Sequence, residues 1–175
     1  MSIGQCNCLI IPLMLFCISA THAHDGMVNI SGVIQDNTCE LAPDSQNKQV
    51  DMGTFTGGQF GRIGDFSPAK SFSLNLQNCG PAASEATVTF SGAADLSNPD
   101  FFAIDAEADS ARGLALGIYD ASGTRVVPGA TSDAFKLQPL QTAVKLDFSA
   151  RYVSVLDSVS AGNANVTVTF VVNYS

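Results

Sequence analysis

Short stretches in which apolar and polar residues alternate recur along almost the whole of this 175-residue chain. A period of two places alternate side chains on opposite faces of a β-strand, whereas an amphipathic helix needs a period near 3.6. The alternating stretches are residues 27–35, 48–55, 71–79, 86–92, 143–155 and 165–175, with a hairpin over 114–127. About eight short strands separated by turn residues, with no convincing helical pattern, predict an all-β fold of the β-sandwich type.

Two parts of the chain do not alternate. Residues 56–70 are rich in glycine and predict an irregular edge or loop. Residues 96–112 contain Pro99 and a group of acidic residues, and they predict a long connection with at most a short helical turn. No internal repeat, linker or second domain is visible, so we expect one domain after the N-terminal segment.

The N-terminal segment has the pattern of a signal peptide. Leu9–Ile18 is an apolar run shorter than the roughly 20 residues that a membrane-spanning helix needs. Thr21-His22-Ala23 follows as a small-x-small cleavage site. We therefore expect residues 1–23 to be removed on export, with an uncleaved anchor as the alternative.

Two cysteines remain once Cys6, Cys8 and Cys17 leave with the signal peptide. Cys39 and Cys79 form an even pair in an exported protein, which predicts a disulfide in preference to two free thiols. Closing a loop of about 40 residues would stabilise the fold by about 3–4 kcal/mol in the chain-entropy model.

Composition argues against several classes of function. A formal charge of −8 without a basic cluster disfavours binding to nucleic acid. The only histidines are His22 and His24, so the domain has none for a Ser-His-Asp or Cys-His site or for most zinc sites. We expect neither enzyme activity, nor a cofactor, nor a metal.

One acidic cluster is a candidate calcium site. Asp105, Glu107 and Asp109 have the spacing of the first EF-hand ligands. However, Ser110 stands where that loop needs glycine, and Leu116 stands where it needs the bidentate glutamate. The cluster is better interpreted as a solvated acidic loop.

The last alternating stretch is the most regular. Its apolar row is Val166, Val168, Phe170, Val172 and Tyr174. Burying these five side chains at roughly 1.5–3 kcal/mol each would make the strand a major part of the core. A strand at the extreme terminus is also open to pairing by another protein, and the two interpretations are compatible.

Several sequence features of the mature chain, taken in their order, resemble those of a known protein family. Tyr174 is the penultimate residue, Gly162 is the fourteenth from the end, and Cys79 closes the stretch FSLNLQNC. VDMG at 50–53 and FSARYVSV at 148–155 complete the pattern. The chain resembles the pilins of the chaperone–usher pathway, in particular the type 1 fimbrial subunits of Gram-negative bacteria.

The resemblance implies an incomplete immunoglobulin-like β-sandwich, the pilin fold, which lacks its seventh strand and so has a hydrophobic groove along its core. In that family a periplasmic chaperone fills the groove, and at the outer-membrane usher the N-terminal extension of the next subunit replaces it. The implied domains are a signal peptide at 1–23, a donor-strand extension at 24–36 and a pilin domain at 37–175.

The resemblance also implies roles for particular residues. Val28, Ile30, Gly32 and Ile34 correspond to the donor strand that enters a neighbour's groove. Gly162, Val166, Val168, Phe170, Val172 and Tyr174 correspond to the C-terminal strand that the chaperone recognises. The implied partners are the chaperone, the usher and neighbouring subunits in a head-to-tail polymer.

The expected function is that of a structural subunit of a fimbria, exported through the periplasm to the cell surface and supporting adhesion. Only 15 mature residues precede Cys39, and this short extension favours a minor tip or adaptor subunit, with the major rod pilin as the alternative. The rival from another class is a self-complete secreted β-sandwich that binds carbohydrate, in which the first strand completes its own core.

Overall fold

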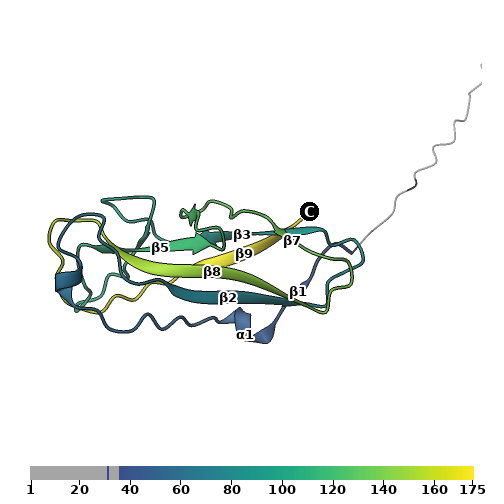
Figure 1. Cartoon of the computed structure of the whole chain (residues 1–175), viewed down its shortest axis with the longest axis horizontal. Helices are drawn as coiled ribbons and strands as arrows, with labels where there is room; N and C mark the ends of the chain where they lie inside the picture. The colour runs from purple at the N-terminus through teal and green to yellow at the C-terminus, as the bar shows by residue number, and fades with distance from the viewer. Residues whose placement is uncertain (1–30, 32–35) are drawn as a thin grey trace, which may run out of the picture. The chain divides into compact units, whose positions relative to one another are not determined.

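The computed structural model describes Ser31 and residues 36–175, and residues 36–175 contain two β-sheets joined by loops (Figure 1). The predicted signal peptide at 1–23 and the predicted donor residues Val28, Ile30, Gly32 and Ile34 lie outside the described residues. No helix in the described part is long and apolar enough to cross a membrane.

The larger sheet is built around one long central strand. Its strands are β1 (Glu40–Leu41), β2 (Lys70–Gln77), β4 (Phe102–Ala103), β5 (Leu114–Asp120), β6 (Arg125–Val126) and β8 (Ala143–Ser154). They lie in the order β1-β2-β8-β5-β4, with β6 also paired to β5, and all pairs are antiparallel. β8 is therefore paired along both of its edges.

The smaller sheet carries the C-terminal strand at its edge. Its strands are β7 (Phe135–Lys136), β3 (Glu85–Ser91) and β9 (Thr169–Tyr174), in the order β7-β3-β9. β9 pairs with β3 only, from Ala86 opposite Tyr174 to Ser91 opposite Thr169. The other edge of β9 has no partner strand among the described residues.

The core lies between the sheets and is rich in phenylalanine. Phe148 on β8 packs on Phe90 of β3 with ring centroids 5.0 Å apart, and on Phe72 of β2 at 5.8 Å. Phe170 of β9 joins this group through Phe90 at 6.3 Å. Because these rings come from both sheets, they hold the two layers together and confirm the predicted β-sandwich.

The disulfide prediction is also confirmed. Cys39 and Cys79 are bonded, and they join the residue before β1 to the end of β2. Backbone hydrogen bonds between residues 36–38 and 80–82 lie beside this disulfide. The start of the described domain is thereby tied to the larger sheet.

Three local predictions were wrong. Residues 48–55 alternate but form no strand, because α1 (Pro43–Gln46) takes the chain away from β2 before a ladder can continue. The last strand begins at Thr169 rather than Asn165, because residues 163–167 bond instead to the acidic loop. The predicted long connection contains β4, in which Phe102 is fully buried and pairs with Leu116.

Candidate strand-binding groove

A groove of about 1350 Å³ runs along one side of the sandwich. Its walls are residues 46–57, including the start of the short 3₁₀ helix η1 (Gly57–Gln59), and residues 159–170. Its floor is apolar and comes from β2, β3, β5 and β8: Phe72, Leu74, Phe90, Leu114, Leu116, Ile118, Ala150 and Tyr152. The core of the sandwich is thus reached directly from this groove.

The backbone of the first wall is largely unpaired. Within the described part of the chain, residues 48–55 make no hydrogen bond between backbone groups, and the Gly53 N–H donates locally to Asp51 Oδ1 at 2.9 Å. The side chains of Met52 and Phe55 pack against the core, so the segment is held through its side chains. Free backbone N–H and C=O groups beside an apolar floor are the features that allow another strand to pair.

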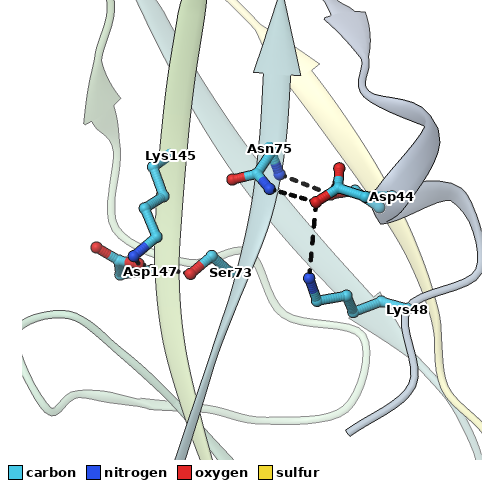
Figure 2. A network of polar contacts seen from close by, with 7 residues as sticks. Asp44, Lys48, Ser73, Asn75, Lys145 and Asp147 are labelled. Carbon is cyan, nitrogen blue, oxygen red and sulfur yellow. Dashed lines mark hydrogen bonds and ion pairs between the residues drawn. The ribbon is translucent and has the colours of Figure 1, made fainter.

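A polar cluster positions the start of this wall. In Figure 2 the carboxylate of Asp44 on α1 lies between Asn75 and Lys48. Asn75 Nδ2 donates a hydrogen bond to Asp44 Oδ2 at 2.6 Å, and Lys48 Nζ lies 3.9 Å from the same oxygen. The backbone N–H of Asn75 donates to the hydroxyl of the buried Ser45 at 2.8 Å. α1 is therefore fixed to β2, and the chain enters the groove wall from there.

A second polar cluster ties β2 to β8 close by (Figure 2). The hydroxyl of Ser73 donates to Asp147 Oδ1 at 2.7 Å, and Lys145 Nζ lies 3.1 Å from the same oxygen. The Ser73 hydrogen bond, followed by the Lys145 ammonium, holds the pKa of the Asp147 carboxyl below its usual value. These exposed contacts keep the sheet in register without contributing to the groove surface.

The second wall carries the predicted C-terminal row. Val166, Val168, Phe170, Val172 and Tyr174 all point to the core side, but each is only half-buried. The first three line the groove, whereas Val172 and Tyr174 lie beyond its lining. The row was expected to be buried as a core strand. It is buried less than expected, because the edge of β9 and the adjoining segment face the groove.

The acidic loop holds this second wall in place. Thr167 Oγ1 donates to Asp105 Oδ2 at 2.9 Å, and the Asp105 N–H donates to the carbonyl of Asn165 at 2.8 Å. Asn163 Nδ2 donates to Asp109 Oδ2 at 2.6 Å. Among the described residues, no group of three or more His, Cys, Asp or Glu side chains is placed to hold a metal. The loop instead acts as a clamp on residues 163–167.

Gly162 is required by the same clamp. A Cβ atom at this position would lie 2.5 Å from the carbonyl oxygen of Asp109 and would press on the amide of Ala111. The two backbones approach too closely for any other residue to fit without a shift. The family resemblance pointed to Gly162, but the sequence did not indicate that a close approach of two backbone segments requires glycine there.

Two tyrosines connect the C-terminal part of the chain to the rest of the sandwich. The buried Tyr152 of β8 donates from its hydroxyl to the carbonyl of Ala164 at 2.5 Å. The hydroxyl of Tyr174 donates to the carbonyl of Cys39 at 3.0 Å and joins the end of β9 to the start of β1. Burial raises the pKa of both phenols.

Sequence reasoning missed three parts of this site. Asp105 and Asp109 were considered only for calcium, and Tyr152 only as part of a strand. Their roles depend on contacts with residues more than 10 positions away, such as the Asp105–Thr167 pair. No periodicity in the sequence could have indicated those contacts.

The groove is suited to binding an extended peptide. Its apolar floor can take alternate side chains, and its walls offer largely unpaired backbone at residues 48–55 and along one edge of β9. This combination is the one used in β-strand addition, in which main-chain hydrogen bonds supply affinity and side-chain pockets supply specificity.

The curated relatives of this chain include fimbrial subunits. The probable major fimbrial subunit LpfA of Escherichia coli O157:H7 is 37% identical over 158 residues, which cover 90% of this chain and 88% of the relative. Long polar fimbria protein A of Salmonella typhimurium is 31% identical over 156 residues, covering 89% and 86%.

Solved structures show the same fold. The type I fimbria protein BPSL1626 of Burkholderia pseudomallei is 30% identical with a TM-score of 0.61, covering 79% of this chain and 90% of that one. The P pilus rod subunit PapA has a TM-score of 0.64 at 21% identity, covering 78% and 99%, and so supports the fold alone. The family model described as fimbrial protein matches residues 28–175. The chain therefore belongs to the fimbrial protein family, with the pilin fold of chaperone–usher pili, and it is a non-enzymatic structural subunit of a surface fimbria.

Proposed function

We propose that the groove binds the N-terminal extension of a neighbouring subunit and that residues 24–36 of this chain fill the groove of the next one. The observation that carries the proposal is the half-buried row from Val166 to Tyr174 beside an unpaired strand edge and an apolar floor. Val28, Ile30, Gly32 and Ile34 form the inserted row, and Gly32 is the small residue within it.

Before assembly, a periplasmic chaperone occupies the same groove with a strand of its own and pairs with the edge of β9. The outer-membrane usher is the site at which the neighbour's extension replaces it. The proposal is supported by the length of the groove wall at 159–170, which offers one continuous surface to either strand. A strand bound there gains both a ladder of hydrogen bonds and burial of alternate side chains.

We further propose that the subunit is repeated along the fimbria. The short extension favours an adaptor at the tip. The LpfA relative is a probable major fimbrial subunit, and this supports the rod alternative. Immunogold labelling along isolated fimbriae separates the two, because an adaptor is labelled only near one end.

The donor role is tested by Ile30→Asp in the mature chain, produced together with its chaperone and usher. A charge in the apolar floor would be desolvated without a partner, so we expect a folded, chaperone-bound subunit and no fimbriae. Asn29→Asp is the matched control, because it adds the same charge on the opposite face of the extension. Fimbriae of normal length from Ile30→Asp would overturn the proposal.

A self-complete secreted β-sandwich predicts a different result. In that case residues 24–35 complete the chain's own core, and deleting them prevents folding and chaperone binding. Under the donor-strand proposal, the deleted protein binds the chaperone but cannot extend a polymer. Chaperone co-purification and electron microscopy of the product distinguish these outcomes.

A further inference from the structure

Leu140 is exposed in a backbone conformation that leucine seldom adopts. It is the third residue of a turn over 138–141, in which the Gln141 N–H donates to the Gln138 carbonyl at 3.2 Å. Its φ is 60°, where a type II turn usually has glycine or asparagine, and 69% of its surface is exposed. An apolar side chain is thus displayed at a position where asparagine would suit the backbone better.

Leu140 lies beside the point at which the extension leaves the domain. Its N–H donates to the carbonyl of Gly80 at 3.3 Å. Gly80 also lies against Asp36, whose carbonyl accepts a hydrogen bond from the Ala82 N–H at 3.1 Å. When the extension of this chain enters the groove of a neighbouring copy, Leu140 of this chain is therefore brought to the open end of that groove.

The opposite end of the domain also displays apolar side chains. Ile63 is 59% exposed and Leu156 is 44% exposed. Two backbone hydrogen bonds of 2.8 Å, from Gly64 to Ser154 and from Ser154 to Asp65, hold their segments together. Figure 1 shows η1, just before this region, at the far end from β1 and the C-terminus.

This apolar end adjoins the groove. Ile63 is three residues after Phe60, Leu156 is three residues before Val159, and both Phe60 and Val159 line the groove. At the other end the lining of β9 stops at Phe170, and beyond it the Tyr174 hydroxyl bonds to the carbonyl of Cys39 and ties the end of β9 to the start of β1. An inserted strand must therefore connect to its own domain through the end near Ile63 and Leu156.

The connection between the inserted donor row and its own domain is too short to keep that domain apart from the domain of the neighbouring copy. Ile34, the last residue of the donor row, precedes Asp36 by two residues, which span at most about 7 Å. Asp36 is already bonded to Ala82 in its own domain. The surface around Gly80 and Leu140 of the neighbour is therefore held against the mouth of the groove.

We propose that Leu140 of one copy packs on Ile63 and Leu156 of the next copy and forms a second contact at each junction. The proposal rests on the donor-strand function and on repetition of the subunit. Two different surfaces meet in this contact, so it is heterologous and propagates as an open filament. Burial of this side chain in the fimbria accounts for a leucine at a left-handed position that is exposed in the single domain.

Photo-crosslinking tests the contact directly in assembled fimbriae. Leu140 is replaced by p-benzoylphenylalanine, and Leu96, a fully exposed leucine elsewhere on the domain, is replaced in the control. We expect ultraviolet light to link position 140 to residues 60–66 or 154–159 of another copy, and position 96 to neither. Assembled fimbriae without such adducts, or with adducts from position 140 to other residues, would overturn the proposal.

Leu140→Asn gives an independent measurement. Asparagine suits a φ of 60°, so we expect the single domain to unfold at an unchanged or higher denaturant concentration. We expect its fimbriae to dissociate in denaturant about tenfold faster, since each junction loses a buried leucine. Leu96→Asn fimbriae should dissociate at the wild-type rate, and equal rates for Leu140→Asn would contradict the contact.

The donor-strand function and the second contact can be refuted separately. If Ile30→Asp still forms fimbriae, the donor-strand function is wrong. If Ile30→Asp forms none but wild-type fimbriae give no adduct from position 140, the donor strand stands and the second contact is wrong.

Discussion

β8 and β9 are both alternating strands, but they differ in what surrounds them. β8 is paired on both edges, and Leu146, Phe148 and Ala150 on its inner face are buried. β9 is paired on one edge, and its inner row is half-buried throughout. β8 therefore holds the monomer together, whereas β9 is a surface on which assembly can build.

The largest expected effect comes from a matched pair of phenylalanines. Phe148→Ala removes a buried ring of β8 and is expected to cost about 3–5 kcal/mol of unfolding free energy. Phe170→Ala on β9 is expected to cost roughly half as much, because the ring is half-buried. Urea unfolding of the mature chain followed by circular dichroism measures both. Equal losses would show that β9 is as deeply packed as β8.

Removing the disulfide tests how far β9 depends on its anchor. Cys39→Ala with Cys79→Ala frees a loop with a sequence separation of 40 and is expected to cost about 3–4 kcal/mol. Because Tyr174 bonds to the Cys39 carbonyl, hydrogen exchange at the end of β9 should accelerate more than in the middle of β8. A uniform acceleration in both strands would contradict this coupling.

Gly162→Ala tests the clamp on the groove wall. The added Cβ would press on the backbone of Asp109 and Ala111, and overpacking of this kind costs roughly 1–3 kcal/mol. Gly58→Ala is the matched control, since a Cβ there meets nothing within 4 Å. Thermal unfolding should separate the two variants, and an unchanged melting temperature for Gly162→Ala would argue against the clamp.

The smallest effect is expected from the tyrosine at the end of β9. Tyr174→Phe removes one hydrogen bond to Cys39 and should cost about 0.5–1.5 kcal/mol. Burial raises the pKa of Tyr174 above 10.0, so its contribution to stability is complete below pH 10 and decreases as the pH rises through the folded-state pKa. The wild-type protein should therefore lose stability above pH 10 more steeply than Tyr174→Phe. Parallel pH profiles would show that Tyr174 has no part in this loss.

Much of the fold could be read from local pattern. The hairpin of β5 and β6, the long β8 and the bond between Cys39 and Cys79 follow from alternation, turn residues and an even cysteine count. These features depend on neighbours in sequence or on a single pair, so they need no knowledge of the packed structure.

The groove wall could not be read in the same way. Apolar and polar side chains alternate in residues 48–55 as regularly as in several strands of the structure. However, these residues form no ladder of backbone hydrogen bonds. Whether an alternating segment becomes a strand depends on a partner with free hydrogen-bonding groups, and α1 directs this segment away from its nearest partner. The alternation therefore predicted correctly that apolar side chains of this segment face the core, but its prediction of a hydrogen-bonded strand was wrong.

By itself the sequence determined the all-β class, the disulfide, the absence of histidine from the domain and the apolar rows at 27–35 and 165–175. Only the tertiary structure decided that β9 lies at a sheet edge and that Asp105 and Asp109 clamp the wall beside it. It also decided that Leu140 lies close to the start of β8, whereas Gly64, next to Ile63, bonds to Ser154 at the end of the same strand. The physical reason is that side-chain periodicity is a local property of the chain, whereas edges, grooves and ends arise only when distant segments pack together.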